Sequence, residues 1–425
     1  MRPPIRLARR GPNATPLPYT ASPLRLLERD LCLCLRYAWA LPLLFIPLRL
    51  GQTTSLDELH PNLQSSKSFG VQVLLTLYQL FFLISLPLLV ICMLPTSGII
   101  VYIAGALAIN YTICMFILNG WDRVVVSQVP TPEQPAQARE CWFFINGVAA
   151  SHHWLQNSVN QLSYTFGRKV TGIHNRTCGL IFDLLECLIQ RCFSYATDDV
   201  RKTYVLIKDA LLDPDCDKVV LILHSQGAIE GGLIVDWLLD ELPRDPLNNL
   251  EVYTFGNAAN HFNNPLHWQQ AVLTPSGAST NHESILRSLG HIEHYVNVGD
   301  PVAWLGVLHF VEFPNCYMGR LFVRPGSGHM MNQHYLDNMF TRGFDGRVLD
   351  SNPFMDMEVE LDPDGSTNGT SGTSGSMCEE TLLPTRDPRR AVPNGSPKEG
   401  VLRVKDFSRL WQYRNGGSPR RLKNE

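Results

Sequence analysis

The feature that most constrains this chain is a block of 48 residues, 71–118, that contains no charged side chain. It divides into two apolar runs, 71–94 and 99–118, with only a four-residue connection between them. Each run has about the 20 residues needed to cross a bilayer. A buried helical hairpin of a soluble core is the alternative, but two such runs without a charge favour lipid. The sequence therefore predicts two transmembrane helices.

The charges on either side of this block predict an orientation. Residues 1–70 carry nine basic and four acidic side chains, residues 381–425 carry eleven and four, and residues 119–380 carry a net charge of −15. A short connection makes the two helices antiparallel, so both flanks lie on one side, and the positive-inside rule makes that side cytoplasmic. The basic residues lie in the tails without a nucleic-acid-binding motif, which argues against a nucleic-acid partner. We expect a multi-pass membrane protein with a cytoplasmic body.

Composition divides the chain into five segments. Residues 1–70 form a basic N-terminal segment whose apolar stretch, 37–48, is too short to span and is interpreted as interfacial. After the spans at 71–118, residues 119–138 form a linker rich in Pro and Gln. Residues 139–342 alternate short apolar runs with longer amphipathic ones, which predicts an α/β domain with a doubly wound, mostly parallel sheet. Residues 343–425 are interpreted as a flexible tail with an amphipathic helix near 401–413, which either lies on an anionic leaflet or packs back onto the acidic body.

The strongest local signal is residues 219–228, VVLILHSQGA, in which an apolar strand ends at Ser225 and small residues lead into a helix. This order is typical of a nucleophile elbow, which holds a hydroxyl above the sheet on a tight turn. The following helix N-terminus favours the negative charge that develops during acyl transfer. The alternative is that Ser225 only caps the helix.

Later segments supply an acid and a base in the order Ser, Asp, His. Asp300 follows an expected strand, and His329 lies in Gly-Ser-Gly-His just before an expected helix. In such a triad His329 takes the proton from Ser225, and Asp300 fixes the tautomer of the ring. His334, five residues later, is the alternative base. We prefer His329 because it lies directly after the loop of the last strand.

The remaining site residues are predicted from the needs of a tetrahedral intermediate. Its oxyanion needs backbone N–H donors from two loops, and we assign these to Gln226 and to Gly147 or Val148. Residues 260–290, a long connection between two expected strands, are predicted to form a cap over the pocket. The sequence has no His, Cys or Asp cluster with metal-ligand spacing, so we expect neither a metal nor another cofactor.

Residues 144–148 (FINGV), 224–227 (HSQG), 297–302 and 328–336 together resemble the α/β-hydrolase superfamily and its lipase-like members. More narrowly, they resemble uncharacterised membrane-anchored hydrolase-like proteins of fungi. The resemblance covers about residues 139–342 and implies the fold and serine-hydrolase chemistry. Two positions depart from it: Leu223 stands where the superfamily usually has a small residue, and Asn146 stands where many lipases have His.

These features predict a membrane-anchored serine hydrolase that cleaves a carboxylic ester, of a lipid or lipid-like molecule, through an acyl-enzyme. Two other functions stay open. One is a catalytically inactive hydrolase fold that serves as a membrane scaffold, for which Leu223 is the best argument. The other is a thioesterase that uses the same three residues.

Overall fold

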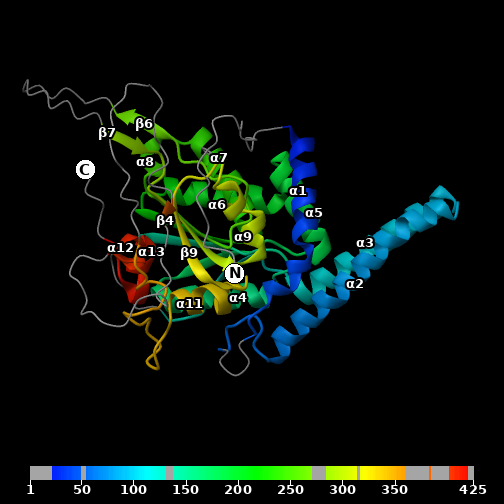
Figure 1. Cartoon of the computed structure of the whole chain (residues 1–425), viewed down its shortest axis with the longest axis horizontal. Helices are drawn as coiled ribbons and strands as arrows, with labels where there is room; N and C mark the ends of the chain where they lie inside the picture. Colours follow the sequence, from blue (N-terminus) through cyan, green and yellow to red (C-terminus); the bar gives the residue numbers. More distant parts are fainter. Residues whose placement is uncertain are drawn as a thin grey trace, which may run out of the picture.

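The computed structural model describes residues 22–48, 54–130, 137–269, 284–313, 316–359, 382–383 and 402–419. Its centre is a mixed sheet of seven strands with a two-residue eighth strand at one edge, in the order β1-β3-β2-β4-β5-β8-β9-β10. All neighbours in this sheet are parallel except β1 and β3. Helices cover both faces (Figure 1). The predicted α/β class with a mostly parallel, doubly wound sheet is confirmed.

The strands of the main sheet are β1 (Val124–Val126), β2 (Glu140–Ile145), β3 (Val170–Ile173), β4 (Lys218–His224), β5 (Leu250–Phe255), β8 (His291–Gly299), β9 (Arg320–Ser327) and β10 (Leu382–Leu383). A separate hairpin pairs β6 (Leu266–Gln269) with β7 (Ser284–Arg287). In β4 every residue after Lys218 is buried, as expected for a central parallel strand covered on both faces. The carboxyl end of β4 therefore lies in the middle of the sheet, between those of β2 and β5.

One face of the sheet is covered by α6 (Asp198–Leu212), α7 (Gln226–Glu241), α8 (Arg244–Leu247), α9 (Pro301–Leu305) and α10 (Val307–Phe310). The other face is covered by α4 (His152–Phe166), the π-helix η3 (Met331–Leu336), α11 (Asp337–Met339) and the C-terminal helices α12 (Val404–Phe407) and α13 (Arg409–Gln412). Helix α4 shows why these segments end where they do. The Ser151 side chain accepts a hydrogen bond from the N–H of Trp154 at its start, and Gly167 adopts the left-handed conformation at its end.

The uncharged block forms a helical hairpin of α2 (Leu63–Ile91) and α3 (Thr96–Ile113), and α3 continues as the π-helix η2 (Cys114–Asn119). Both arms are long and apolar enough to cross a membrane. The far end of the hairpin projects away from the body (Figure 1). Helix α2 starts eight residues before the predicted span and includes Lys67, so the boundary at residue 70 falls inside a helix.

One stripe of α2 packs against the body. The buried residues of this stripe, here called the inner seam, are Ser65, Ser68, Gln72, Leu75, Gln79 and Phe82. They recur at alternating spacings of three and four residues, which places them on one side of a helix. Gln72 Nε2 donates to the carbonyl oxygen of Ala149 at 2.9 Å, and Gln79 Nε2 donates to that of Cys178 at 2.7 Å. The first two thirds of α2 is therefore part of the folded body.

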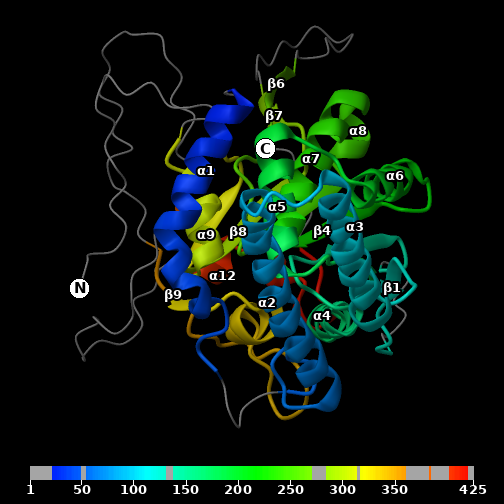
Figure 2. The ribbon, with the colours of Figure 1, turned by 90° about the vertical axis from the view of Figure 1, so that its right-hand side faces the viewer.

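The N-terminal segment also packs against the body. It contains α1 (Pro23–Tyr37) and the 3₁₀-helix η1 (Ala38–Leu44), and α1 lies beside α5 (Leu180–Phe193) (Figure 2). Asp30 forms a buried ion pair with Arg191, with oxygen–nitrogen distances of 2.5 and 2.8 Å. Its partner Arg191 also donates to two body carbonyls, so α1 is held by charge as well as by packing.

The expectation of a flexible tail is wrong for residues 343–359 and 402–419, which pack onto the sheet. The helix predicted near 401–413 is two four-residue helices, and Trp411 is buried in the core against Phe340. Arg409 Nη2 lies 2.8 Å from Glu251 Oε1. The basic side chain is thus bound by an acidic strand residue, so this segment packs on the body instead of on a leaflet.

Candidate active site

Ser225 lies at the turn between β4 and α7 in a strained backbone conformation, with φ 57° and ψ −120°. A positive φ is uncommon for a residue with a side chain and is found at sites that require a special geometry. The turn depends on Gly227, where an added Cβ would lie 2.5 Å from the carbonyl oxygen of Ile145 and 2.8 Å from that of Asn146. The helix can therefore begin directly above β2 only because residue 227 has no side chain. This local geometry is that of a strand–elbow–helix turn.

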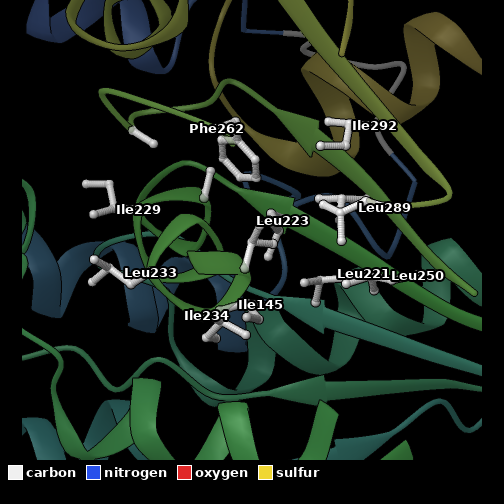
Figure 3. Close-up of a cluster of buried hydrophobic side chains, with 14 of the residues drawn as sticks. Ile145, Leu221, Leu223, Ile229, Leu233, Ile234, Leu250, Phe262, Leu289 and Ile292 are labelled. Atoms are coloured by element: carbon white, nitrogen blue, oxygen red, sulfur yellow. The ribbon is translucent and has the colours of Figure 1, made fainter. Parts of the chain in front are cut away.

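The large residue at position 223 does not crowd this turn. Leu223 is buried and points into the core on the α7 side of the sheet, among Ile229, Leu233 and Phe262 (Figure 3). Room for it comes from Gly231 on α7, where a Cβ would lie only 2.2 Å from Leu223 Cδ1. In this chain a glycine on the helix therefore provides the space that the large side chain at position 223 needs.

Asp300 and His329 form a buried pair near Ser225. Nδ1 of His329 lies 2.8 Å from Oδ2 of Asp300, and the same oxygen accepts a hydrogen bond from the Tyr335 hydroxyl at 2.6 Å. The other carboxylate oxygen accepts from the N–H of Val302. Burial alone would raise the pKa of Asp300, but the His329 ring and these hydrogen bonds lower it below its usual value. An ionised Asp300 holds the proton of His329 on Nδ1, so Nε2 is left as the basic atom.

Ser225 and His329 line the same cavity. In the part of the chain that the structure describes, Nε2 of His329 is buried and has no hydrogen-bond partner. The predicted hydrogen bond from Ser225 to this nitrogen is therefore not formed here. Catalytic hydrogen bonds are often long before substrate binds, so the arrangement does not exclude proton transfer.

His334, the alternative base, is held by other contacts. Its Nδ1 accepts a hydrogen bond from the N–H of Met330 at 3.0 Å, and its Nε2 lies 3.0 Å from the carbonyl oxygen of Pro47. Among the described residues that line the cavity, His329 is present and His334 is not. The geometry favours His329 as the base.

The loop predicted to supply an oxyanion donor lies against the serine. A Cβ on Gly147 would be 2.5 Å from Ser225 Cβ and 3.0 Å from its Oγ. Asn146, at the position where many lipases have His, fastens this loop, because its side chain exchanges hydrogen bonds with the backbone of Asn175. Over the described ranges, the N–H groups of Gly147, Val148 and Gln226 donate to no protein acceptor. These three donors remain the predicted oxyanion hole.

Three residues beside the predicted triad were not found from the sequence. His224 stacks on the His329 ring, with centroids 4.6 Å apart, and its Nε2 lies 2.8 Å from the His329 carbonyl oxygen. Burial lowers the pKa of His224 to about 3, so its ring is neutral. Gly256, at the end of β5, has no side chain where a Cβ would lie 2.7 Å from Asp300 Oδ2. Tyr335, whose hydroxyl bonds to Asp300, is the third. The one sequence signal for it was its position directly after His334 in an expected helix.

The cavity has a volume of about 250 Å³ and is bounded by the body, by η1 and by α2. None of the described residues within 260–269 and 284–290 lines it, and the rest of the predicted cap, 270–283, lies outside the described residues. Among the described residues the N-terminal elements form this wall. Glu58 lines the cavity from the segment between η1 and α2, and burial raises its pKa to about 8. Among the described residues, groups of three or more His, Cys, Asp or Glu side chains able to hold a metal ion are absent.

Comparison with known proteins adds no identification. No model of a known protein family matches the chain, and no curated protein matches its sequence.

Proposed function

We propose that this chain is a membrane-associated serine hydrolase of the α/β-hydrolase type that cleaves a carboxylic ester. The observation that carries the proposal is the meeting of two independent features at one cavity. One is Ser225 on a strained strand-to-helix turn, and the other is a His329–Asp300 pair in which His329 lines the same cavity and its Nε2 has no hydrogen-bond partner among the described residues. A helix cap would require neither the buried pair nor the cavity.

The reaction follows from this arrangement. Nε2 of His329 takes the proton from Ser225 Oγ as that oxygen attacks the carbonyl carbon of the ester. The N–H groups of Gln226 and of Gly147 or Val148 stabilise the oxyanion. The bond to the alcohol oxygen then breaks as His329 returns its proton to that oxygen, which leaves an acyl group on Ser225. A water molecule then attacks the acyl carbon while His329 takes its proton. The bond to Ser225 Oγ breaks as His329 returns the proton to that oxygen, which releases the acid and restores the serine.

The two other functions make different demands on the same residues. An inactive scaffold needs no reactive serine, and its best support, crowding by Leu223, is removed by the space at Gly231. A thioesterase needs the same triad, since only the leaving group differs. Matched oxygen-ester and thioester substrates separate these two reactions by their relative kcat/KM.

The decisive experiment is covalent labelling of the full chain in vesicles with a fluorophosphonate, which reacts with an activated serine. The wild-type protein should be labelled, and Ser225→Ala should abolish labelling. Ser158→Ala is the matched control, because Ser158 also lines the cavity and should leave labelling unchanged. His329→Gln should slow labelling strongly, whereas folded wild-type protein that takes up no label would support the scaffold.

The proposal includes the side of the membrane on which the body lies. The basic N-terminal residues and the body flank the same end of the hairpin, and the positive-inside rule assigns that end to the cytoplasm.

A further inference from the structure

One wall of the candidate active site is a membrane helix. Phe69, Gln72, Val73, Thr76 and Leu77 of α2 line the cavity opposite Ser225 and His329. Two of them also reach the outer surface, since Val73 is 44% exposed and Leu77 is 60% exposed. Single side chains of α2, such as Val73 and Leu77, are thus all that lies between the cavity and the outer surface at these positions.

This wall is fixed to the body and is not a loose tether. Gln72 and Gln79 of the inner seam bond to carbonyl oxygens of the body, and Gln79 Oε1 also accepts from the N–H of Ile181. At the other edge of the cavity the Phe45 ring packs edge-on against Phe69, with centroids 5.4 Å apart. At this edge of the cavity η1 and α2 therefore meet through apolar side chains.

The surface beside this wall has the polarity of a lipid-facing one. Helix α5, which packs beside α2 (Figure 2), buries Asp183, Gln190 and Arg191 and leaves its remaining charged residue, Glu186, half-buried. Its exposed positions are apolar: Leu184, Leu185, Ile189 and Phe193. A helix in contact with water has the opposite pattern. An apolar surface continuous with two apolar helices is the kind that a bilayer covers.

The lining also restricts the substrate. Among the described residues that line the cavity there is no lysine or arginine, so a phosphate or carboxylate group would find no cationic partner. The unpaired polar atoms at its wall include Glu58 Oε2, Gln72 Oε1 and Trp154 Nε1, all buried. These acceptor and donor atoms can form hydrogen bonds with a hydroxyl group of the substrate. A volume of about 250 Å³ is smaller than the roughly 300–1,000 Å³ that holds a whole drug-sized ligand.

From these observations we propose that the substrate is an uncharged, hydroxyl-bearing ester lipid that reaches Ser225 sideways from the bilayer, between η1 and α2, without crossing water. Only the ester and the adjoining part of one chain occupy the cavity, and the rest of the lipid stays in the leaflet. This proposal rests on the proposed hydrolase function and names its substrate class and route.

The first test compares two leucines of α2 in the full chain reconstituted in vesicles. Leu77 is 60% exposed and lines the cavity, while Leu74 is 67% exposed and does not. Leu77→Trp should reduce hydrolysis of a long-chain monoacylglycerol in the vesicle about tenfold, because displacing about two methylene groups costs that much in binding. Hydrolysis of a short water-soluble ester should fall by a clearly smaller factor, so the ratio of the two rates is the readout, and Leu74→Trp should change neither rate.

The contrary results are distinct. Equal loss on both substrates, or no loss on either, would overturn the sideways route while leaving the hydrolase in place. Faster hydrolysis of a phospholipid than of the monoacylglycerol would overturn the uncharged substrate class.

A second test does not depend on turnover. Ser225→Ala protein in vesicles is irradiated with a monoacylglycerol that carries a diazirine near its ester. Adducts on Val148, Met330 or Met331, which line the cavity, support the route even if the wild-type protein shows no hydrolysis and the proposed function fails. Adducts confined to outward residues such as Leu74 and Phe81 overturn it.

Discussion

Replacing Gly231 by alanine should disable the elbow while leaving the protein folded. The added Cβ would lie 2.2 Å from Leu223 Cδ1 and 2.8 Å from its Cδ2, whereas carbon atoms pack at about 3.5–4.0 Å. Overpacking of this kind costs about 1–3 kcal/mol, and alanine regains about 1 kcal/mol of helix propensity. The free energy of unfolding should therefore fall by only about 0–2 kcal/mol.

Activity should fall much further. The body of β4 is held between β2 and β5, so we expect the packed Leu223 side chain to relieve the clash by shifting the end of the strand. Leu223 lies only two residues before Ser225, so this shift displaces the serine. A displacement near 1 Å at a reacting group costs about 100-fold. The assay is the rate of fluorophosphonate labelling, with thermal unfolding measured on the same reconstituted sample.

Two further variants make the reasoning refutable. Gly232→Ala is the matched control, because its Cβ would meet nothing closer than the His261 carbonyl oxygen at 3.4 Å, and it should label at the wild-type rate. Leu223→Ala combined with Gly231→Ala removes both partners of the clash, so labelling should return to within about tenfold of wild type despite lower stability. A normal rate for Gly231→Ala alone, or a folded double variant as slow as the single one, would refute the steric account.

Three other predictions follow from named contacts. Tyr335→Phe removes a hydrogen bond to the ionised Asp300, and since such bonds contribute about 1.5–3 kcal/mol, kcat/KM should fall about 10- to 100-fold with little change in KM. Glu58 has its pKa raised by burial from 4.5 to about 8. The folded state therefore retains a proton that the unfolded chain has lost, and stability should decline as pH rises from about 4.5 to 8. Thermal unfolding across this range should show a shallower decline in Glu58→Gln. Asp30→Ala leaves Arg191 buried without its carboxylate, which should lower the free energy of unfolding by about 3–5 kcal/mol in denaturant titrations.

The α/β class and the mostly parallel sheet could be predicted from the sequence because the inner strands are buried on both faces. Such strands are continuous apolar runs, as in residues 219–223, and the amphipathic runs between them are long enough for helices. The elbow could also be located, because its signal is a local pattern: an apolar strand, then Ser225, then small residues that lead into a helix. The roles of Ser225, Asp300 and His329 stay predictions until labelling is measured.

The closure of the site could not be predicted in the same way. The uncharged run was assigned to lipid over its whole length, so its contact with the body was missed. Gln72 and Gln79 within the run indicated such a contact, because polar side chains in an apolar helix usually face protein. The tail was misjudged because the partner of Arg409 is Glu251, a buried strand residue far away in the sequence. Gly231 was missed because space for Leu223 depends on how α7 lies over β4, which no local pattern encodes.

The inner seam has a consequence for how the protein is made. On the proposed membrane topology, the hairpin brings Gln72, Gln79 and Asn110 into lipid before their partners in the body exist. The chain from Asn119 to Ile181 takes about 3–12 s to synthesise at about 5–20 residues per second. During that interval bare amides in hydrocarbon are costly.

Part of this cost is met inside the hairpin itself. Gln79 Nε2 donates to Asn110 Oδ1 at 2.9 Å, and the Tyr78 hydroxyl donates to the carbonyl oxygen of Ala106 at 2.9 Å. Among the described residues the side chain of Gln72 has no such partner on α3, and it donates only to the carbonyl oxygen of Ala149 and the hydroxyl of Thr177. On this topology the two arms can therefore pair before the body folds, whereas the Gln72 side chain gains its partners only when the body packs against α2.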